Sequence, residues 1–279
     1  MVVFAVVVST GCDPAFDPIK ETNRSYSVYG YLNASADTQF IRIEKLRDNM
    51  PIGTLDDLGA DVRLTNVTTG QTTLLQDSLF NYRVGRAHNY FTTLQVNPEQ
   101  QYRLEVQGNE EASSAEVDIP DTFPEPNLAP RKEFVQVQDI DRLIAVKTIY
   151  DTCQNCGGLG GCPDEPYIRR FTYSHLADTA HIQGSGIRAN YNMAEDLSEV
   201  SNNYPRNAAF TIVRGSVVIA AGTANWPNFL ELDAEAAALP NVASNIDGGV
   251  GLLGGIVTDT VTFEKNPPTA CYTSSNKIK

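Results

Sequence analysis

Positive charge is scarce in this chain of 279 residues, in which 21 Lys and Arg stand against 34 Asp and Glu. The formal charge of −13 and the absence of a basic cluster exclude nucleic acid as an expected partner, because phosphate backbones attract clustered Lys and Arg. Beyond the first residues, no apolar run approaches the roughly eighteen residues that a membrane-spanning helix needs. The class of protein must therefore be inferred from other features.

Motifs of the common catalytic and metal sites are also missing. The sequence has no Gly-x-Ser-x-Gly elbow for a serine nucleophile and no Asp-rich calcium loop. His175 and Asp178 could join a serine in a hydrolase triad, and Ser185, between Gly184 and Gly186, comes nearest to the missing elbow. Adjacent acids such as Asp56 and Asp57 are expected to be solvated charges. We therefore predict no catalytic residue, no metal and no cofactor.

The N-terminus is typical of a bacterial lipoprotein signal. An apolar run from Val2 to Val8 leads through Ser9-Thr10-Gly11 to Cys12, where a signal peptidase would cut and leave a lipid-modified cysteine. No Lys or Arg precedes the run, and Ser9 stands where Leu is more usual. The alternative is a buried N-terminal strand. We predict that residues 1–11 are a signal peptide, that Cys12 is acylated, and that residues 12–23 are a tether.

Four further cysteines are expected to form two disulfides, because an even number in an exported chain is typical of such bridges. They are Cys153, Cys156, Cys162 and Cys271. A bridge from Cys153 to Cys156 closes a very small ring, so we expect Cys271 to pair with one of these two. Zinc is the alternative, since Cys-x2-Cys is half of a zinc ribbon, but the second half is missing.

The first half of the chain is a succession of predicted strands. Alternation of apolar and polar residues is clearest at 102–106 and 115–119, and the stretch 62–76 predicts a hairpin that turns at 68–70. Short strands without intervening helices favour an antiparallel sandwich of immunoglobulin-like or transthyretin-like type. The other predicted strands of this half lie at residues 25–31 and 40–44.

A proline-rich stretch from 120 to 130 interrupts the strands, because proline cannot continue a sheet. We predict a sandwich domain at 24–120, a linker at 121–130 and a second β-rich domain at 131–279 that carries the disulfide loop. The second half holds predicted strands at 142–150, 167–175, 210–220 and 255–263. It also holds one predicted helix at 228–238 and long loops at 157–166 and 190–205.

The sequence Gly-Val-Gly-Leu-Leu-Gly at 249–254 matches the nucleotide-binding fingerprint letter for letter. That fingerprint needs a strand before it and a helix after it. Here a loop-like stretch precedes the glycines and a strand-like stretch follows them. We therefore predict a tight bend with close packing and no bound nucleotide.

Five aromatic residues of the predicted sandwich have two interpretations. They are Tyr26, Tyr29, Tyr31, Tyr90 and Phe91. Strands use aromatic side chains routinely for packing, so we expect them in the core. The alternative is an exposed stacking platform for sugar or peptide.

Two segments resemble a known family. Residues 25–39 (Ser-Tyr-Ser-Val-Tyr-Gly-Tyr-Leu-Asn-Ala-Ser-Ala-Asp-Thr-Gln) are similar to the opening of the Bacteroidota lipoproteins grouped as domain of unknown function 4249 (DUF4249). Residues 240–255 are similar to its C-terminal signature. The resemblance implies an outer-membrane lipoprotein with an N-terminal immunoglobulin-like domain, often encoded near TonB-dependent receptors. It supplies no catalytic residue, and the cysteine cluster departs from the family pattern.

These features favour a non-enzymatic, lipid-anchored protein on the periplasmic or cell-surface face of the outer membrane, assisting a TonB-dependent receptor in binding or uptake. A secreted hydrolase acting on envelope polymers or glycans is one alternative, and a purely structural envelope protein is another. A flat aromatic or apolar exposed face would favour the first function, whereas a deep pocket of convergent polar groups would favour the hydrolase.

Overall fold

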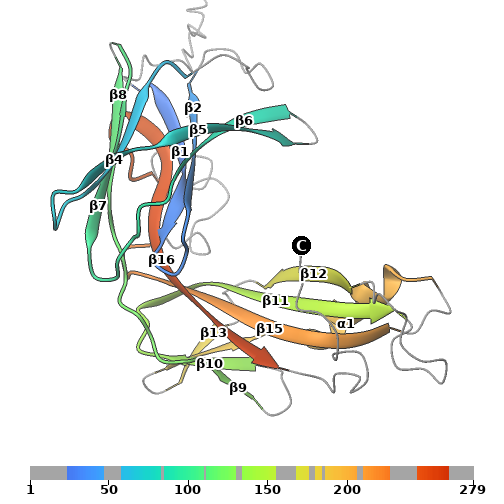
Figure 1. Ribbon diagram of the computed structural model, residues 1–279. Helices are drawn as coiled ribbons and strands as arrows, with labels where there is room; N and C mark the ends of the chain where they lie inside the picture. The colour runs from blue at the N-terminus through green and yellow to red at the C-terminus, as the bar shows by residue number, and fades with distance from the viewer. Residues whose placement is uncertain are drawn as a thin grey trace, which may run out of the picture.

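The computed structural model describes residues 24–46, 58–82, 85–109, 111–129, 134–154, 168–175, 180–183, 186–205, 210–226 and 244–263. These ranges form sixteen strands and one short helix, arranged in two β-rich lobes that Figure 1 shows as an upper and a lower body. The predicted all-β fold class is confirmed.

The first lobe is a sandwich of two sheets. Its smaller sheet has the order β4-β3-β7-β8, formed by β3 (Asp61–Asn66), β4 (Thr72–Leu74), β7 (Gln101–Gln107) and β8 (Ala112–Asp118). It packs against one half of an eight-stranded sheet, which contains β1 (Tyr26–Asn33), β2 (Gln39–Lys45), β5 (Gln76–Tyr82) and β6 (Gly85–Thr92).

Burial in the smaller sheet follows the alternation of the sequence. Tyr102, Leu104 and Val106 of β7 are buried, whereas Arg103 and Glu105 between them are exposed. This pattern arises because successive side chains of a strand point to opposite faces, so that one face meets the core and the other meets water. The predicted hairpin is also confirmed, since β3 and β4 pair antiparallel.

The second lobe uses the other half of the eight-stranded sheet and a second four-stranded sheet. The large sheet contributes β11 (Arg142–Gln154), β12 (Ile168–His175), β15 (Phe210–Gly222) and β16 (Gly249–Phe263). The small sheet has the order β13-β14-β10-β9, formed by β9 (Asn127–Leu128), β10 (Phe134–Gln138), β13 (Ala180–Gln183) and β14 (Gly186–Asn190).

Strand β16 belongs to both lobes and makes the eight-stranded sheet continuous. Its first half pairs parallel with β1, from Gly249 opposite Tyr26 to Ile256 opposite Asn33. Its second half pairs antiparallel with β15, from Ile256 opposite Gly222 to Phe263 opposite Gly215. The stretch 249–256, which the sequence analysis grouped with the second domain, is therefore a strand of the first-lobe sheet as well.

The glycine motif at 249–254 is part of β16, so the predicted bend before the strand is wrong. Glycine has a low strand propensity, so these residues are held in a strand by their pairing with β1. The predicted close packing is confirmed. Gly251 has a φ of +117°, and a Cβ atom there would collide with the Val28 carbonyl. Pairing with β1 engages one edge of the motif's backbone.

The stretch 190–205, predicted to be a long loop, contains helix α1 (Met193–Asn202). The Asn192 side chain caps this helix, accepting from the Glu195 backbone N–H at 3.1 Å, while its amide donates to the Glu195 carboxylate at 3.1 Å. Asp196 and Val200 of the helix are buried, and Met193 and Leu197 are partly buried against the core, so the apolar residues recur at helical spacing. The predicted helix at 228–238 and loop at 157–166 lie outside the described residues.

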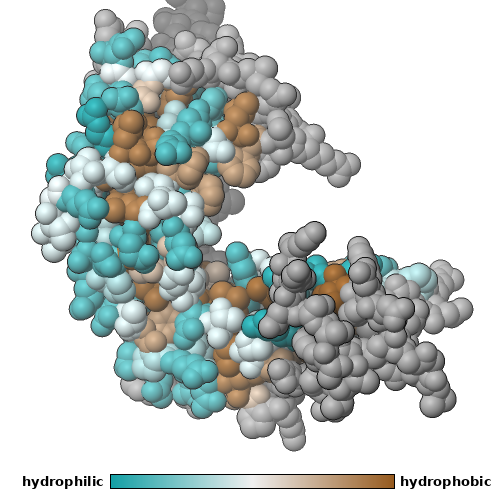
Figure 2. Space-filling model, in the orientation of Figure 1, coloured by the Kyte–Doolittle hydropathy of each residue, from teal (hydrophilic) through white to brown (hydrophobic). Residues whose placement is uncertain are grey.

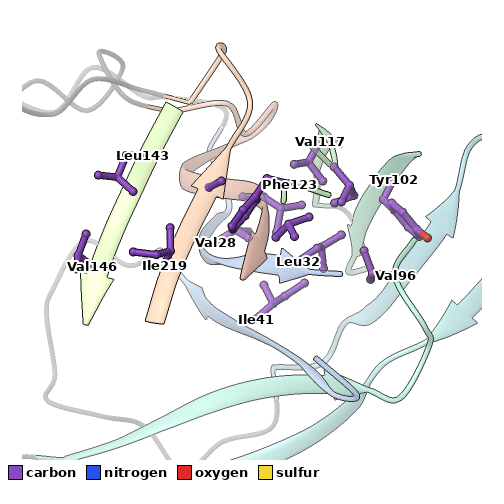
Figure 3. Close-up of a cluster of buried hydrophobic side chains, with 14 of the residues drawn as sticks. Val28, Leu32, Ile41, Val96, Tyr102, Val117, Phe123, Leu143, Val146 and Ile219 are labelled. Carbon is purple, nitrogen blue, oxygen red and sulfur yellow. The ribbon is translucent and has the colours of Figure 1, made fainter. Parts of the chain in front are cut away.

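Buried apolar side chains from both lobes form one hydrophobic cluster. Complete burial of a side chain such as Leu32 contributes about 1.5–3 kcal/mol relative to exposure. Phe123 of the proline-rich stretch is also buried in the cluster, so this stretch packs onto the core. Figure 3 shows members from both lobes, among them Val28, Leu32, Ile41, Val117 and Phe123 of the first and Leu143, Val146 and Ile219 of the second.

Candidate functional site

Aromatic side chains gather on the outer face of the large sheet in the first lobe. Tyr29 and Tyr31 of β1 point away from the core and are 55% and 50% exposed. Phe40 of β2 is 49% exposed and Phe80 of β5 is 41% exposed. Phe91 of β6 is half-buried beside them. We call these five side chains the aromatic face.

Phe40 connects the aromatic rings of neighbouring strands. It pairs across the strands with Phe91, at a ring-centroid distance of 6.0 Å, and meets Phe80 edge-to-face at 6.1 Å. Such aromatic pairs contribute about 0.5–1.5 kcal/mol beyond their burial. The rings therefore hold one another in place while much of their surface stays in contact with water.

The charges beside the aromatic face cancel locally. Arg42 lies opposite Tyr29 in the strand register and donates to the Glu44 carboxylate at 2.9 Å through Nε. Both members of this ion pair are exposed, so its contribution to stability is small. The face thus presents neutral aromatic surface on a chain whose net charge is −13.

The expected core position of the aromatic residues is right for two and wrong for two. Tyr26 and Tyr90 are buried, as predicted, whereas Tyr29 and Tyr31 are exposed. Phe40 and Phe80 were missed by the sequence analysis. The alternation of β1 contained a usable signal, because Tyr29 and Tyr31 share one face and Tyr26 lies on the other.

Exposed large apolar side chains that adjoin one another mark interaction sites more often than isolated ones do. Figure 2 shows hydrophobic surface exposed on the upper lobe among hydrophilic side chains. By contrast, two hollows of about 270 and 410 Å³ are open to solvent and lie at other places, around Ser113 and around Gly108. Neither hollow involves the aromatic face or a histidine.

A buried polar group connects α1 to the second lobe. Asp196 of α1 is 4% exposed and accepts hydrogen bonds from the Thr148 hydroxyl at 2.6 Å and the Tyr150 hydroxyl at 2.9 Å. His175 Nε2 lies 3.2 Å from the same carboxylate oxygen and 3.0 Å from Thr148 Oγ1. We call Thr148, Tyr150, His175 and Asp196 the Asp196 group.

The Asp196 group does not have the geometry of a catalytic triad. In a triad, the nucleophile donates to one ring nitrogen of the histidine while the other nitrogen donates to the acid. Here Thr148 donates to Asp196, and His175 Nε2 faces both Thr148 and Asp196. The predicted acid partner Asp178 and the candidate serine Ser185 lie outside the described residues.

The hydrogen bonds of Asp196 control its protonation. Burial raises the pKa of Asp196, but the hydrogen bonds from His175, Thr148 and Tyr150 outweigh burial and lower it below its ordinary value. Burial, followed by the Asp196 charge, raises the pKa of Tyr150 and of Tyr191. At neutral pH the group is therefore a buried carboxylate held by neutral hydroxyls.

Of the five cysteines with a predicted role, Cys153 alone lies within the described residues. Cys153 is buried near the end of β11, whereas Cys12, Cys156, Cys162 and Cys271 lie outside the described residues. Within the part of the chain that is described, no three His, Cys, Asp or Glu side chains come together as a metal site. A search of the same residues finds no helix with the length and apolar character needed to cross a bilayer.

Removing the Asp196 carboxylate is expected to destabilise the protein. Asp196→Ala removes the carboxylate that accepts from two buried hydroxyls, so the free energy of unfolding should fall by about 3 kcal/mol. Chemical denaturation followed by circular dichroism measures this loss, with Glu199→Ala on the exposed side of α1 as the control. Because the folded-state pKa of Asp196 is lowered, its contribution is present above the ordinary pKa of aspartate and is lost as pH falls below it. A variant as stable as the wild type would contradict this role.

Comparison with known proteins gives one family and no curated relative. The family model described as domain of unknown function (DUF4249) matches residues 13–154, just over half of the chain. The comparison with curated proteins gives no match. Among solved structures, a DUF4785 family protein from Legionella pneumophila is 11% identical with a TM-score of 0.23. The match covers 70% of this chain and 52% of that one, so the chain spans about half of its length. The family match shows that this chain belongs to DUF4249.

Proposed function

We propose that this protein is a non-enzymatic, lipid-anchored accessory protein of the outer membrane that binds a partner through the aromatic face. The observation that carries the proposal is the row of rings on three adjacent strands, from the exposed Tyr31 and Phe40 to the half-buried Phe91. A folded protein gains nothing from leaving such rings in water. Tyr and Phe are also favoured at the centres of protein interfaces, where their large surfaces are buried at low cost in side-chain entropy.

The partner that we infer is a TonB-dependent receptor, which is the class that the family resemblance implies. The neutral character of the aromatic face supports a protein partner, since charged residues are depleted in interface cores. An enzymatic role finds less support, because the Asp196 group binds α1 to the sheet and its hydroxyls donate to the acid instead of to His175.

Lipid at Cys12 would place this face near the membrane. Residues 12–23 span at most about 40 Å when fully extended, which keeps the first lobe within one domain diameter of an anchored Cys12. A tether of this length restricts the protein to partners at the same membrane and raises its effective concentration there.

Two disulfides among Cys153, Cys156, Cys162 and Cys271 complete the proposal. Burial of Cys153 at the end of β11 supports a structural role for this cysteine. A bridge from the β11 end to Cys271 would close a loop of about a hundred residues, and such loops contribute about 4–5 kcal/mol in the chain-entropy model.

Photo-crosslinking in native cells tests the aromatic face. A photoreactive amino acid at position 31 or 40 should form a crosslink with a TonB-dependent receptor, identified by mass spectrometry. The same amino acid at Leu74, which is 58% exposed on the other sheet, should not. Tyr31→Ala with Phe40→Ala should reduce the amount of copurified receptor about tenfold or more, because interface aromatics commonly contribute over 1 kcal/mol each. Equal crosslinking at all three positions would contradict the proposed surface.

The anchor is tested with Cys12→Ala. The wild-type protein should partition into the membrane fraction and carry an added mass of acyl chains, whereas the variant should lack both properties. A Glu125→Gln variant, which changes an exposed side chain, serves as the expression control. If both proteins appear equally in the soluble fraction, the anchor is refuted.

Thiol counting tests the disulfides. In denatured and unreduced protein, none of the four cysteines from Cys153 onward should react with a thiol reagent, and all four should react after reduction. Four reactive thiols before reduction, together with one bound zinc ion, would contradict the disulfides and support the zinc site.

A further inference from the structure

Within the described residues, strand β5 is an edge of the eight-stranded sheet. It is the last strand in the sheet order, and among the described residues only β6 pairs with it. Its seven residues therefore direct alternate backbone N–H and C=O groups away from the protein. A row of such groups is a template for one kind of occupant, namely another extended strand.

The β5–β6 hairpin also projects beyond the rest of the sheet (Figure 1). The pairs between β2 and β6 end at Arg42 opposite Asn89, whereas those between β5 and β6 continue to Tyr82 opposite Gly85. An isolated two-stranded ribbon is only marginally stable in water. Leu79 lies on this projecting part and is 40% exposed, so the ribbon has apolar surface that a partner could cover.

The two edges of the sheet differ in how they discourage pairing. The opposite edge strand, β12, carries Arg169 and Arg170, which donate to the Asn203 carbonyl at 2.9 Å and to the Asp151 carboxylate at 2.7 Å. Cationic residues on an edge strand discourage pairing with another chain. Strand β5 contains no Lys, Arg or Pro. Its one charged residue, Asp77, binds His88 Nδ1 at 2.7 Å. Strand β5 therefore lacks the cationic and proline residues that commonly protect a strand edge.

We propose that β5 pairs with β5 of a second copy of this chain, in antiparallel orientation about a two-fold axis at Leu79. Centring the pairing on Leu79, the middle residue, aligns all seven residues of both strands. Position 77 then lies opposite position 81, an asparagine, so no carboxylate faces another. The two Leu79 side chains meet on the axis and lose their exposure to water.

The charge pattern favours a second copy as the occupant. A symmetric interface must be complementary to itself, and in this register β5 places its one carboxylate opposite a neutral residue in both directions. Repulsion between two chains of charge −13 acts over longer distances and is screened within about 8 Å at physiological ionic strength. The dimer should therefore become tighter as salt concentration rises.

Charge substitution at the axis tests the register. In full-length protein carrying Cys12→Ala, sedimentation should show monomers becoming dimers as concentration rises to about 100 μM. Leu79→Lys and Leu79→Glu each place like charges directly opposite, so each variant alone should weaken dimerisation at least tenfold. A mixture of the two should restore dimers, because position 79 then faces an opposite charge. Leu74→Lys, an exposed leucine on β4, should dimerise as the unsubstituted protein does.

Hydrogen exchange provides a readout that does not depend on substitutions. Backbone amides in residues 76–82 should gain protection as protein concentration rises, whereas those in β12 should not. A monomer at all concentrations, or dimers that persist in both Leu79 variants, would overturn the proposal. Dimers that disappear on adding reductant alone would overturn it too, since a disulfide would then explain them. A failure to restore dimers in the mixture would exclude the register at Leu79.

Discussion

The pairing of β16 with strands of both lobes is the constraint on which the rest of the structure depends. At Ile256 the strand leaves β1 and continues with β15 as partner, so one rigid element crosses the junction. Side chains reinforce this point, because the Asn33 amide donates to Thr258 Oγ1 at 3.1 Å and the Ser35 hydroxyl donates to the Thr258 carbonyl at 2.6 Å. The shared hydrophobic cluster follows from this continuity.

The large sheet is covered to different extents in the two lobes. In the second lobe, a helix covers part of the sheet, and the hydrogen bonds of Asp196 hold that helix in place. In the first lobe, the outer face of β1, β2 and β5 leaves Tyr29, Phe40 and Phe80 open to water. Open sheet surface and an open sheet edge at β5 thus occur in the same lobe.

Local patterns explain which parts of the fold the sequence predicts. The strands around Tyr102 and Val117 follow from alternation, since each has one wet face and one buried face. The first half of β16 was missed because its glycines form a strand only with β1 as partner, which is information from more than 200 residues away. Helix α1 was missed although the sequence carried a local signal, because Met193, Leu197 and Val200 recur at helical spacing behind the cap Asn192.

In the candidate site too, the sequence predicts local features but not those that depend on distant parts of the chain. Outward orientation of Tyr29 and Tyr31 follows from their spacing, but their exposure depends on whether anything covers the sheet. The partner of His175 was out of reach of sequence reasoning, because Asp196 is brought to it by the docking of α1 and not by proximity along the chain.

The contact between β1 and β16 joins the first strand of the fold to its last, with Tyr26 opposite Gly249. Contacts of such large sequence separation slow folding, because the entropy of closing a long loop must be lost before the contact forms. A chain that emerges from a ribosome or a translocon N-terminus first has no completed first lobe until nearly all of it has emerged. A fragment limited to residues 13–154 would leave the β16 side of β1 without its strand, so the family-matched region is not expected to be an autonomous folding unit.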